Sequence, residues 1–197
     1  MRNICCQSLA SIAIVAVGAM LFSLPVQAGD PAGVQFSFFD VNAPDTDQVK
    51  GVRFPVLYGK GNTNLTGWDL PVLAWSELNS MSGVHWAPWL VSGNHIRGEM
   101  KGVAASALNW HEGQDTGVNL GVVNITNNVK GVNLSAVNVS KGYTVADVGL
   151  VNVSQKSNFQ LSWVNVTQEL NGLQIGLLNC AKNGFLPCFP LFNFGGE

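Results

Sequence analysis

The sequence predicts an all-β protein made of tandem repeats of about 14 residues, with a parallel β-solenoid as the favoured architecture. A ten-residue unit recurs eleven times from Gly33 onward, and the unit starts are separated by 18, 16, 16, 19, 15, 14, 14, 13, 14 and 14 residues. Val, Ile, Leu and Phe alternate with other residues inside each unit, which is the periodicity of β-strands. Frequent Gly and Pro disfavour helices. A short period with variable insertions is typical of arrays built from one supersecondary unit.

The composition narrows the classes of function. Of the 197 residues, 47% are hydrophobic and 11% are charged, whereas about 25% are charged in typical soluble domains. A chain this apolar can bury a core, so we expect it to fold rather than to remain disordered. The formal net charge is −2 and no basic patch is present, so we expect no nucleic-acid partner.

The first element, residues 1–28, reads as a cleaved secretory signal peptide. Arg2 provides a positive start, residues 9–24 form an apolar stretch, and Val26-Gln27-Ala28 is a small-x-small cleavage site. No later apolar run reaches the ~20 residues that a membrane helix requires. Residues 29–197 then form a single β-repeat domain, which we expect at the cell surface, at the outer membrane or in the periplasm.

The irregular repeats occupy residues 33–111. Position one of the unit is Gly in eight of the eleven copies, and position five is always small or Pro. Positions two, four and six fall on one face of the strand, whereas positions seven and nine fall on the other, so we expect a bend at position five. The column at position eight starts irregularly here, with Asp40, Tyr58, Ala74 and Leu90.

The regular repeats occupy residues 117–195 and include GVNLGVVNIT (117–126) and GVNLSAVNVS (131–140). Positions four and seven are apolar in every copy, and position three is polar in most. Position eight is Asn in seven copies, of which the first belongs to the last irregular unit: Asn109, Asn124, Asn138, Asn152, Asn165, Asn179 and Asn193.

Two β architectures fit these units. In a parallel solenoid each unit is one coil stacked at about 4.8 Å on the previous one, and the Asn column becomes a ladder in which each amide donates to the next. All copies point the same way, which favours this arrangement. The alternative is an antiparallel β-meander or membrane β-barrel, because ten-residue strands match the ~9–11 residues of membrane-barrel strands. In a barrel the tryptophans would form an interfacial girdle; otherwise we expect each of them in the core: Trp68, Trp75, Trp86, Trp89, Trp110 and Trp163.

The units of residues 117–194 resemble those of a group of uncharacterised bacterial exported surface-repeat proteins. The shared pattern is G-[VL]-[NQ]-[LI]-[GS]-x-[VL]-N-[VI], and the likeness fades through residues 33–111. The resemblance implies a location in the cell envelope. It supplies no catalytic residue to map onto this chain.

Cys180 and Cys188 are the only cysteines after the predicted signal peptide. They lie in adjacent units, and an exported chain meets an oxidising compartment. A disulfide between them would fasten the C-terminal end, where a repeat array frays. The alternative is a pair of buried thiols.

No pattern of catalytic or ligand-binding residues stands out. His95, Glu99, His111 and Glu112 can be drawn as a cluster, but their spacing matches no metalloprotease motif. The acidic residues of the insert at 43–48 lack the full ligand set of a calcium loop. We therefore predict no enzyme, no catalytic, cofactor-binding or metal residue, and no cofactor.

These observations predict a non-enzymatic, exported cell-envelope or surface protein that acts as a structural or adhesive binding scaffold. The alternative is an integral outer-membrane β-barrel that serves as a pore or an anchor. The partner is an envelope or surface component of unspecified chemistry. Membrane association stays open, and so does self-association, because the ends of a parallel array expose unpaired strand edges.

Overall fold

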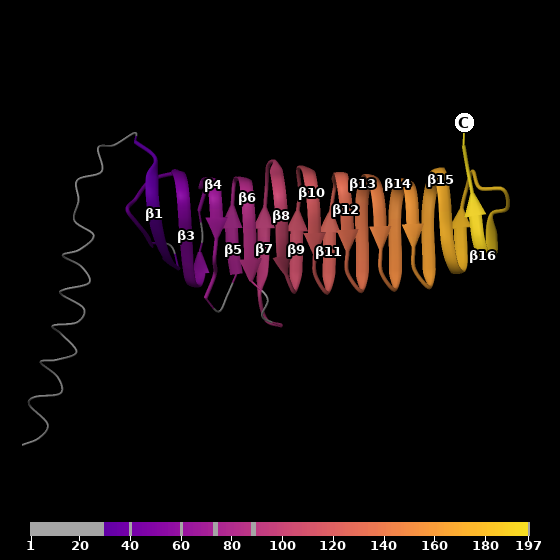
Figure 1. Cartoon of the computed structure of the whole chain (residues 1–197), viewed down its shortest axis with the longest axis horizontal. Coiled ribbons are helices and arrows are strands. Elements are labelled where there is room, and N and C mark those ends of the chain that lie inside the picture. Colours follow the sequence, from indigo (N-terminus) through magenta and orange to yellow (C-terminus); the bar gives the residue numbers. More distant parts are fainter. Residues whose placement is uncertain (1–29, 40, 60, 73–74, 88–89, 197) are drawn as a thin grey trace, which may run out of the picture.

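The computed structural model describes residues 30–39, 41–59, 61–72, 75–87 and 90–196 (Figure 1). The predicted signal peptide lies outside these residues. Within them the regular structure is entirely β, in one continuous sheet that coils into a β-solenoid of about nine turns. The predicted all-β repeat fold and the favoured solenoid are confirmed. Among these residues there is no helix with the length and apolarity to cross a membrane.

The irregular repeats form the N-terminal half of the rod, drawn indigo to magenta in Figure 1. Their strands are β1 (Ala32–Phe39), β2 (Val41–Ala43), β3 (Gln48–Gly59), β4 (Asn64–Asp69), β5 (Trp75–Leu78), β6 (Ser80–Ala87), β7 (Gly93–Ile96), β8 (Met100–Ser106) and β9 (Leu108–His111).

The regular repeats form the C-terminal half, drawn from reddish pink through orange to yellow in Figure 1. As the units become shorter, single strands run round more than one side of a coil. The strands are β10 (Gln114–Leu120), β11 (Val123–Thr126), β12 (Asn128–Leu134), β13 (Val137–Val148), β14 (Val151–Leu161), β15 (Val164–Ala181) and β16 (Cys188–Phe194).

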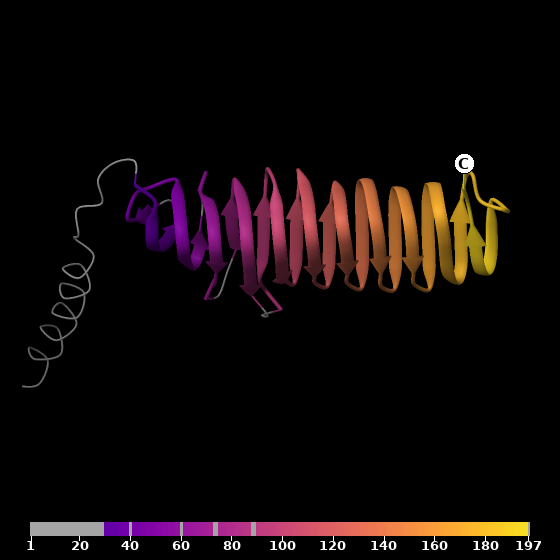
Figure 2. The ribbon, with the colours of Figure 1, turned by 45° about the horizontal axis from the view of Figure 1, so that its top comes forward.

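Neighbouring coils run parallel and in register, as the stacked ribbons of Figures 1 and 2 show. Gly117 pairs with Gly131 and Asn119 with Asn133 between β10 and β12, while Asn124 pairs with Asn138 between β11 and β13. One face of the rod carries β4, β6, β8, β10 and β12, and the other carries β5, β7, β9 and β11. The parallel arrangement is therefore the one that forms, with like residues over like.

The glycines at position one are explained by a close approach between coils. Gly102 has φ +125°, and a Cβ atom built on it would lie 2.0 Å from the carbonyl oxygen of Gly83 in the previous coil. Gly117 repeats this contact with Gly102 at 1.9 Å. Only glycine fits such a site, because it tolerates positive φ and has no side chain.

The ten-residue units turn most of their polar side chains inward and most of their apolar side chains outward, although an apolar cluster that includes Leu65, Met81 and Met100 is buried in the N-terminal half. Positions three and eight point into the coil, whereas positions two, four, six, seven and nine face out. The expectation that the tryptophans pack in the core is wrong for Trp68, Trp86, Trp110 and Trp163, which are 36 to 63% exposed. Trp75 is half-buried, and Trp89 lies outside the described residues. Alternation shows only that the two sides of a strand differ, so it cannot decide which side faces inward.

The two ends of the rod are built differently from its middle. At the C-terminal end β16 pairs antiparallel with β15, so the last segment reverses the direction of the coils. At the N-terminal end β1 pairs parallel with β3 and antiparallel with β2. Each end of the array thus carries an antiparallel pairing.

Candidate functional site

The Asn column forms a continuous amide ladder along the inside of the rod. Each side-chain Nδ2 donates to the Oδ1 of the asparagine in the next coil, at 2.7 to 3.0 Å. All members are 0% exposed. The ladder joins Asn94, Asn109, Asn124, Asn138, Asn152, Asn165 and Asn179.

From Asn109 to Asn179 the ladder amides also donate to backbone oxygens. Asn109 donates to the backbone oxygen of Leu120 at 2.8 Å, and Asn165 donates to that of Ile175 at 2.9 Å. None of the seven ladder asparagines, all of which the structure describes, leaves a buried side-chain polar atom unpaired. A buried amide is costly unless its hydrogen bonds are made, so this full pairing is what makes a polar interior stable.

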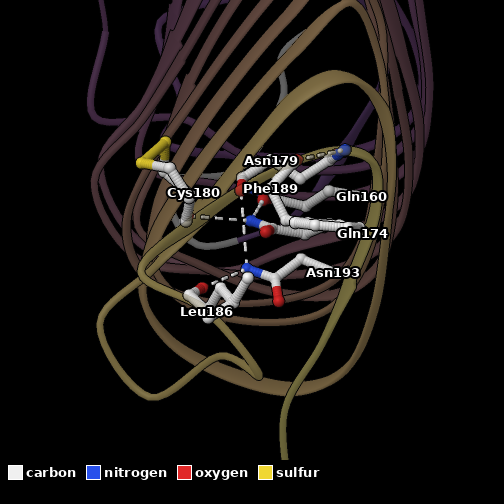
Figure 3. Close-up of a disulfide and its surroundings, with 8 residues drawn as sticks. Gln160, Gln174, Asn179, Cys180, Leu186, Phe189 and Asn193 are labelled. Carbon is white, nitrogen blue, oxygen red and sulfur yellow. Dashed lines mark hydrogen bonds between the residues drawn. A yellow bond between two sulfur atoms is a disulfide. The ribbon is translucent and has the colours of Figure 1, made fainter.

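The structure departs from the expected column at its C-terminal end and in the N-terminal coils. Asn193 ends the ladder, because the antiparallel β16 directs its Nδ2 to the backbone oxygens of Leu186 at 2.9 Å and Asn179 at 3.4 Å (Figure 3). Upstream, the expected register is wrong: Leu90 lies in a turn and is 87% exposed, while Asn94 occupies the column. The insertion before β7 delays this coil by four residues, which the ten-residue alignment missed. Ser76 pairs with Asn94, and Gly59 rather than Tyr58 pairs with Ser76, whereas Ala74 lies outside the described residues.

Serine and glycine alternate at position five along six successive coils. The serine hydroxyls of the regular coils donate to the ladder, as Ser135 does to Asn138 Oδ1 at 2.8 Å. In the intervening coils a side chain has no room, because a Cβ atom on Gly149 would lie 2.2 Å from the backbone oxygen of Ser135. The alternating residues are Ser106, Gly121, Ser135, Gly149, Ser162 and Gly176.

A second polar column, at position three, converges on one carboxylate. Asn133 donates to Asp147 Oδ1 at 2.8 Å from one side, and Gln160 donates to Asp147 Oδ2 at 3.5 Å from the other. Gln174 in turn donates to Gln160 at 2.7 Å (Figure 3). Burial raises the pKa of Asp147 to about 6, although hydrogen bonds from Asn133, Thr144 and Gln160 act to lower it.

In the N-terminal half the same column holds opposite charges. Arg53 Nη1 lies 3.3 Å from Asp69 Oδ1, and His85 Nδ1 lies 2.8 Å from Asp69 Oδ2. Ser76 donates to the same carboxylate at 2.6 Å. Burial alone would raise the pKa of Asp69, but Arg53, His85 and Ser76 together hold it below its ordinary value. All four side chains are 0% exposed, so they stabilise one another out of contact with solvent.

The fold keeps only part of the cluster that the sequence allowed. His95 is 9% exposed and lies 3.1 Å from Glu112. His111 belongs to a different network in the interior, with Nδ1 2.7 Å from Asp115 and Nε2 2.8 Å from Asn94, and Glu99 pairs with Lys101. Among the described residues, no group of three or more His, Cys, Asp or Glu side chains is placed to hold a metal ion.

Cys180 and Cys188 form a disulfide with an S–S distance of 2.08 Å. It links β15 to the reversed strand β16. Figure 3 places the disulfide on the outer side of the coil and the amides of Gln160 and Gln174 inside it. Of the two alternatives for these cysteines, the structure has the covalent one.

The ten-residue units of the regular coils are apolar on their outer side. From the coil that begins at Gly117 to the coil that ends at Ala181, positions two, four, six, seven and nine hold only Val, Leu, Ile, Ala, Phe, Trp or Cys. We call the position-six column the apolar corner, since it joins the two faces along one edge of the rod: Val122, Ala136, Leu150, Trp163, Leu177 and Leu191.

Charges collect at the opposite edge. Between residues 116 and 182, which the structure describes without a gap, the charged side chains that reach the surface are four lysines and one glutamate. We call this edge the lysine corner: Lys130, Lys141, Lys156, Glu169 and Lys182.

Two open hollows lie along the apolar corner. One, of about 420 Å³, includes Leu161, Trp163, Leu177 and Leu191 in its lining. The other, of about 250 Å³, includes Trp86, Leu90 and Val122. The apolar corner was visible in the sequence as the unbroken apolar column at position six, but only the structure shows that this column faces outward.

No protein-family model matches the chain, and no curated protein or solved structure shows significant similarity to it. The interpretation of the site therefore depends on its own geometry.

Proposed function

We propose that the protein is an exported, non-enzymatic scaffold of the cell envelope that binds a partner through its apolar outer surface. One observation carries the proposal: the polar side chains pair inside the rod, while the outward positions of the regular coils are apolar. Large exposed apolar surfaces mark interaction sites in soluble proteins. A rigid rod of stacked coils presents such a surface over a long distance without needing a pocket.

The placement of the acid–base groups supports a non-enzymatic role. Asp69, His85, His111 and Asp115 are each 0 to 2% exposed and are engaged with neighbouring side chains. A catalytic group has to reach its substrate. The hollows at the surface lie instead along the apolar corner.

Two features support export. The residues of the predicted signal peptide have the order that secretion signals require. The disulfide between Cys180 and Cys188 is of a kind that persists in oxidising compartments.

The test is to express the full chain in a bacterial host, sequence the N-terminus of the product and fractionate the cells. We expect a product that starts at Gly29 and is found in the envelope or outside the cell. The variant Ile14→Asp with Val17→Asp interrupts the apolar stretch, so it should accumulate as an uncut precursor. An uncut native chain in the cytoplasm would overturn the proposal.

A further inference from the structure

The outer surface of the regular coils is apolar on three sides, namely the two faces and the apolar corner between them. A second copy of the chain packed against one face would leave the other face and the corner in water. A fluid hydrocarbon phase covers all three sides at once. The inference that follows deepens the proposed scaffold function, and rests on it, by naming the partner.

The backbone of the apolar corner is already satisfied. Leu150 N donates to Ala136 O at 2.9 Å, Val164 N donates to Leu150 O at 3.1 Å, and Leu178 N donates to Trp163 O at 2.9 Å. Turns of most proteins leave such groups to water, whereas a segment in hydrocarbon must pair them within the protein. This corner meets that requirement coil after coil.

The charges have the distribution of an interfacial protein. Four lysines and one glutamate give the lysine corner a net charge of +3, and the opposite corner carries no charge between residues 116 and 182. Lysines at the edge of an apolar body lie at the level of lipid headgroups and are attracted to anionic ones.

The dimensions also fit a single leaflet. Positions two to four are extended and positions five and six form the bend of the corner, so these five residues reach at most about 16 Å at ~3.3 Å per residue. Half of a hydrocarbon core of ~30 Å is about 15 Å. The hollow beside Trp163 and Leu177 adds an apolar concavity of about 420 Å³ at the edge that would lie deepest.

From these observations we propose that coils 117–181 lie lengthwise in one leaflet of a lipid membrane. The apolar corner points into the acyl chains and the lysine corner lies among anionic headgroups. The amide ladder and the position-three column stay enclosed, so no interior polar group meets the hydrocarbon.

The experiment is flotation of the purified protein with vesicles of phosphatidylcholine alone or mixed with phosphatidylglycerol. We expect the native protein to float with both and more strongly with the mixed vesicles. The variant Val122→Lys, Leu150→Lys, Leu177→Lys places charge at the deepest edge and should lower partitioning by at least about tenfold. These side chains are exposed in the free protein, so the fold should persist, and circular dichroism checks it.

The matched control adds the same three charges on the other side of the rod. Gln114→Lys, Thr116→Lys and Gln155→Lys all change exposed side chains near the lysine corner. This variant should float at least as well as the native protein. Brominated acyl chains should also quench the tryptophan fluorescence of the native protein more than that of Trp163→Phe.

Several outcomes would overturn the inference. One is a native protein that does not float, and another is an equal loss of partitioning in both lysine variants. The third is a lipid-free oligomer of the native protein that the variant Val122→Lys, Leu150→Lys, Leu177→Lys no longer forms, which would assign the surface to a second copy. An exported protein that fails to float refutes the lipid inference alone. A protein that floats but is never exported refutes the scaffold's location instead.

Discussion

The two halves of the rod fill the same interior in different ways. In the N-terminal half, Leu65, Leu78, Met81, Ile96 and Met100 belong to a buried apolar cluster, next to the charged network around Asp69. In the regular coils the interior columns are mostly amides and hydroxyls. Where units are nearly identical, each side chain meets its own kind, and an amide can both donate and accept. Where units have diverged, neighbours must instead be complementary in charge or shape.

The difference extends to the hydrogen bonds of the Asn ladder. The ladder leaves no buried side-chain polar atom unpaired, whereas Arg53 Nε and Nη2 and His85 Nε2 in the N-terminal network have no partner. The position-three column of the regular coils is less complete than the ladder, since Asn119 Oδ1 and Gln174 Oε1 also have no partner. The N-terminal half therefore depends on a few strong charge pairs, and the regular coils depend on many equal, weaker bonds. The following predictions test this contrast, from the largest expected effect to the smallest.

Asp69→Asn should be the most damaging of these changes. It leaves Arg53 buried without its carboxylate, and breaking a buried pair costs about 3–5 kcal/mol of unfolding free energy. Because the pKa of Asp69 is lowered in the folded protein, its contribution is complete above the unfolded pKa and is lost as the pH falls through the folded one. Denaturation at pH 7 measures the loss, with Asp45→Asn as the exposed control. A change below about 1 kcal/mol would contradict the charged-pair interpretation.

Asp147→Asn should raise the free energy of unfolding, whereas Asp69→Asn lowers it. Because the folded pKa of Asp147 is raised to about 6 from 3.8, the buried charge costs stability above pH 6, and this cost is relieved as the pH falls towards 3.8. Removing the charge should stabilise the protein by up to about 3 kcal/mol at pH 8. The difference from the native protein should disappear near pH 4. Denaturation curves at both pH values decide, and a destabilised variant at pH 8 would show that the converging hydrogen bonds outweigh the burial cost.

Asn138→Val should cost about 1–3 kcal/mol, because it leaves the amides of Asn124 and Asn152 without their partner. The matched change on the outside is Leu150→Asn, which should cost less than about 0.5 kcal/mol since that side chain is exposed. In an ordinary β protein the ranking would be reversed. Thermal unfolding of the two variants therefore tests the inside-out arrangement itself.

Ser135→Ala should produce the smallest loss, about 1 kcal/mol. The Ser135 hydroxyl lies 2.8 Å from Asn138 Oδ1 and 2.6 Å from Val137 O. Without it, Asn138 Oδ1 still accepts a hydrogen bond from Asn124 Nδ2 at 3.0 Å. Thr116→Ala, at an exposed position, is the control. If Ser135→Ala matched Asn138→Val in cost, the hydroxyls rather than the amides would be the main support of the column.

Part of this structure could be predicted from the sequence and part could not. The eleven-fold pattern predicted strands, their parallel stacking and the Asn column, because identical units that stack by translation place like over like. The sequence could not show that Asn138 points inward and Trp163 outward. A period of two assigns residues to the two sides of a strand but does not tell which side is buried. Asn94 was missed because the insertion before β7 displaces it from its column.

The apolar corner shows the same limit for the candidate site. Its residues were visible as a column, yet a buried column and a lipid-facing column have the same composition. Only the structure distinguishes the two, because it shows that the polar columns pair with one another inside the rod and leave the apolar column outside. The lysines of the lysine corner are single residues at variable spacing, so no sequence motif predicts that they lie along one edge.

The alternation of serine and glycine at position five has a consequence for how such a rod can change its length. The true period of the regular half is a pair of coils, because a serine coil and a glycine coil pack against each other. Duplicating one coil would put two serines or two glycines in succession, and the extra serine would meet backbone where Gly149 now fits. Duplicating two coils would preserve every contact. We therefore expect natural variants of this chain to differ in length by even numbers of coils.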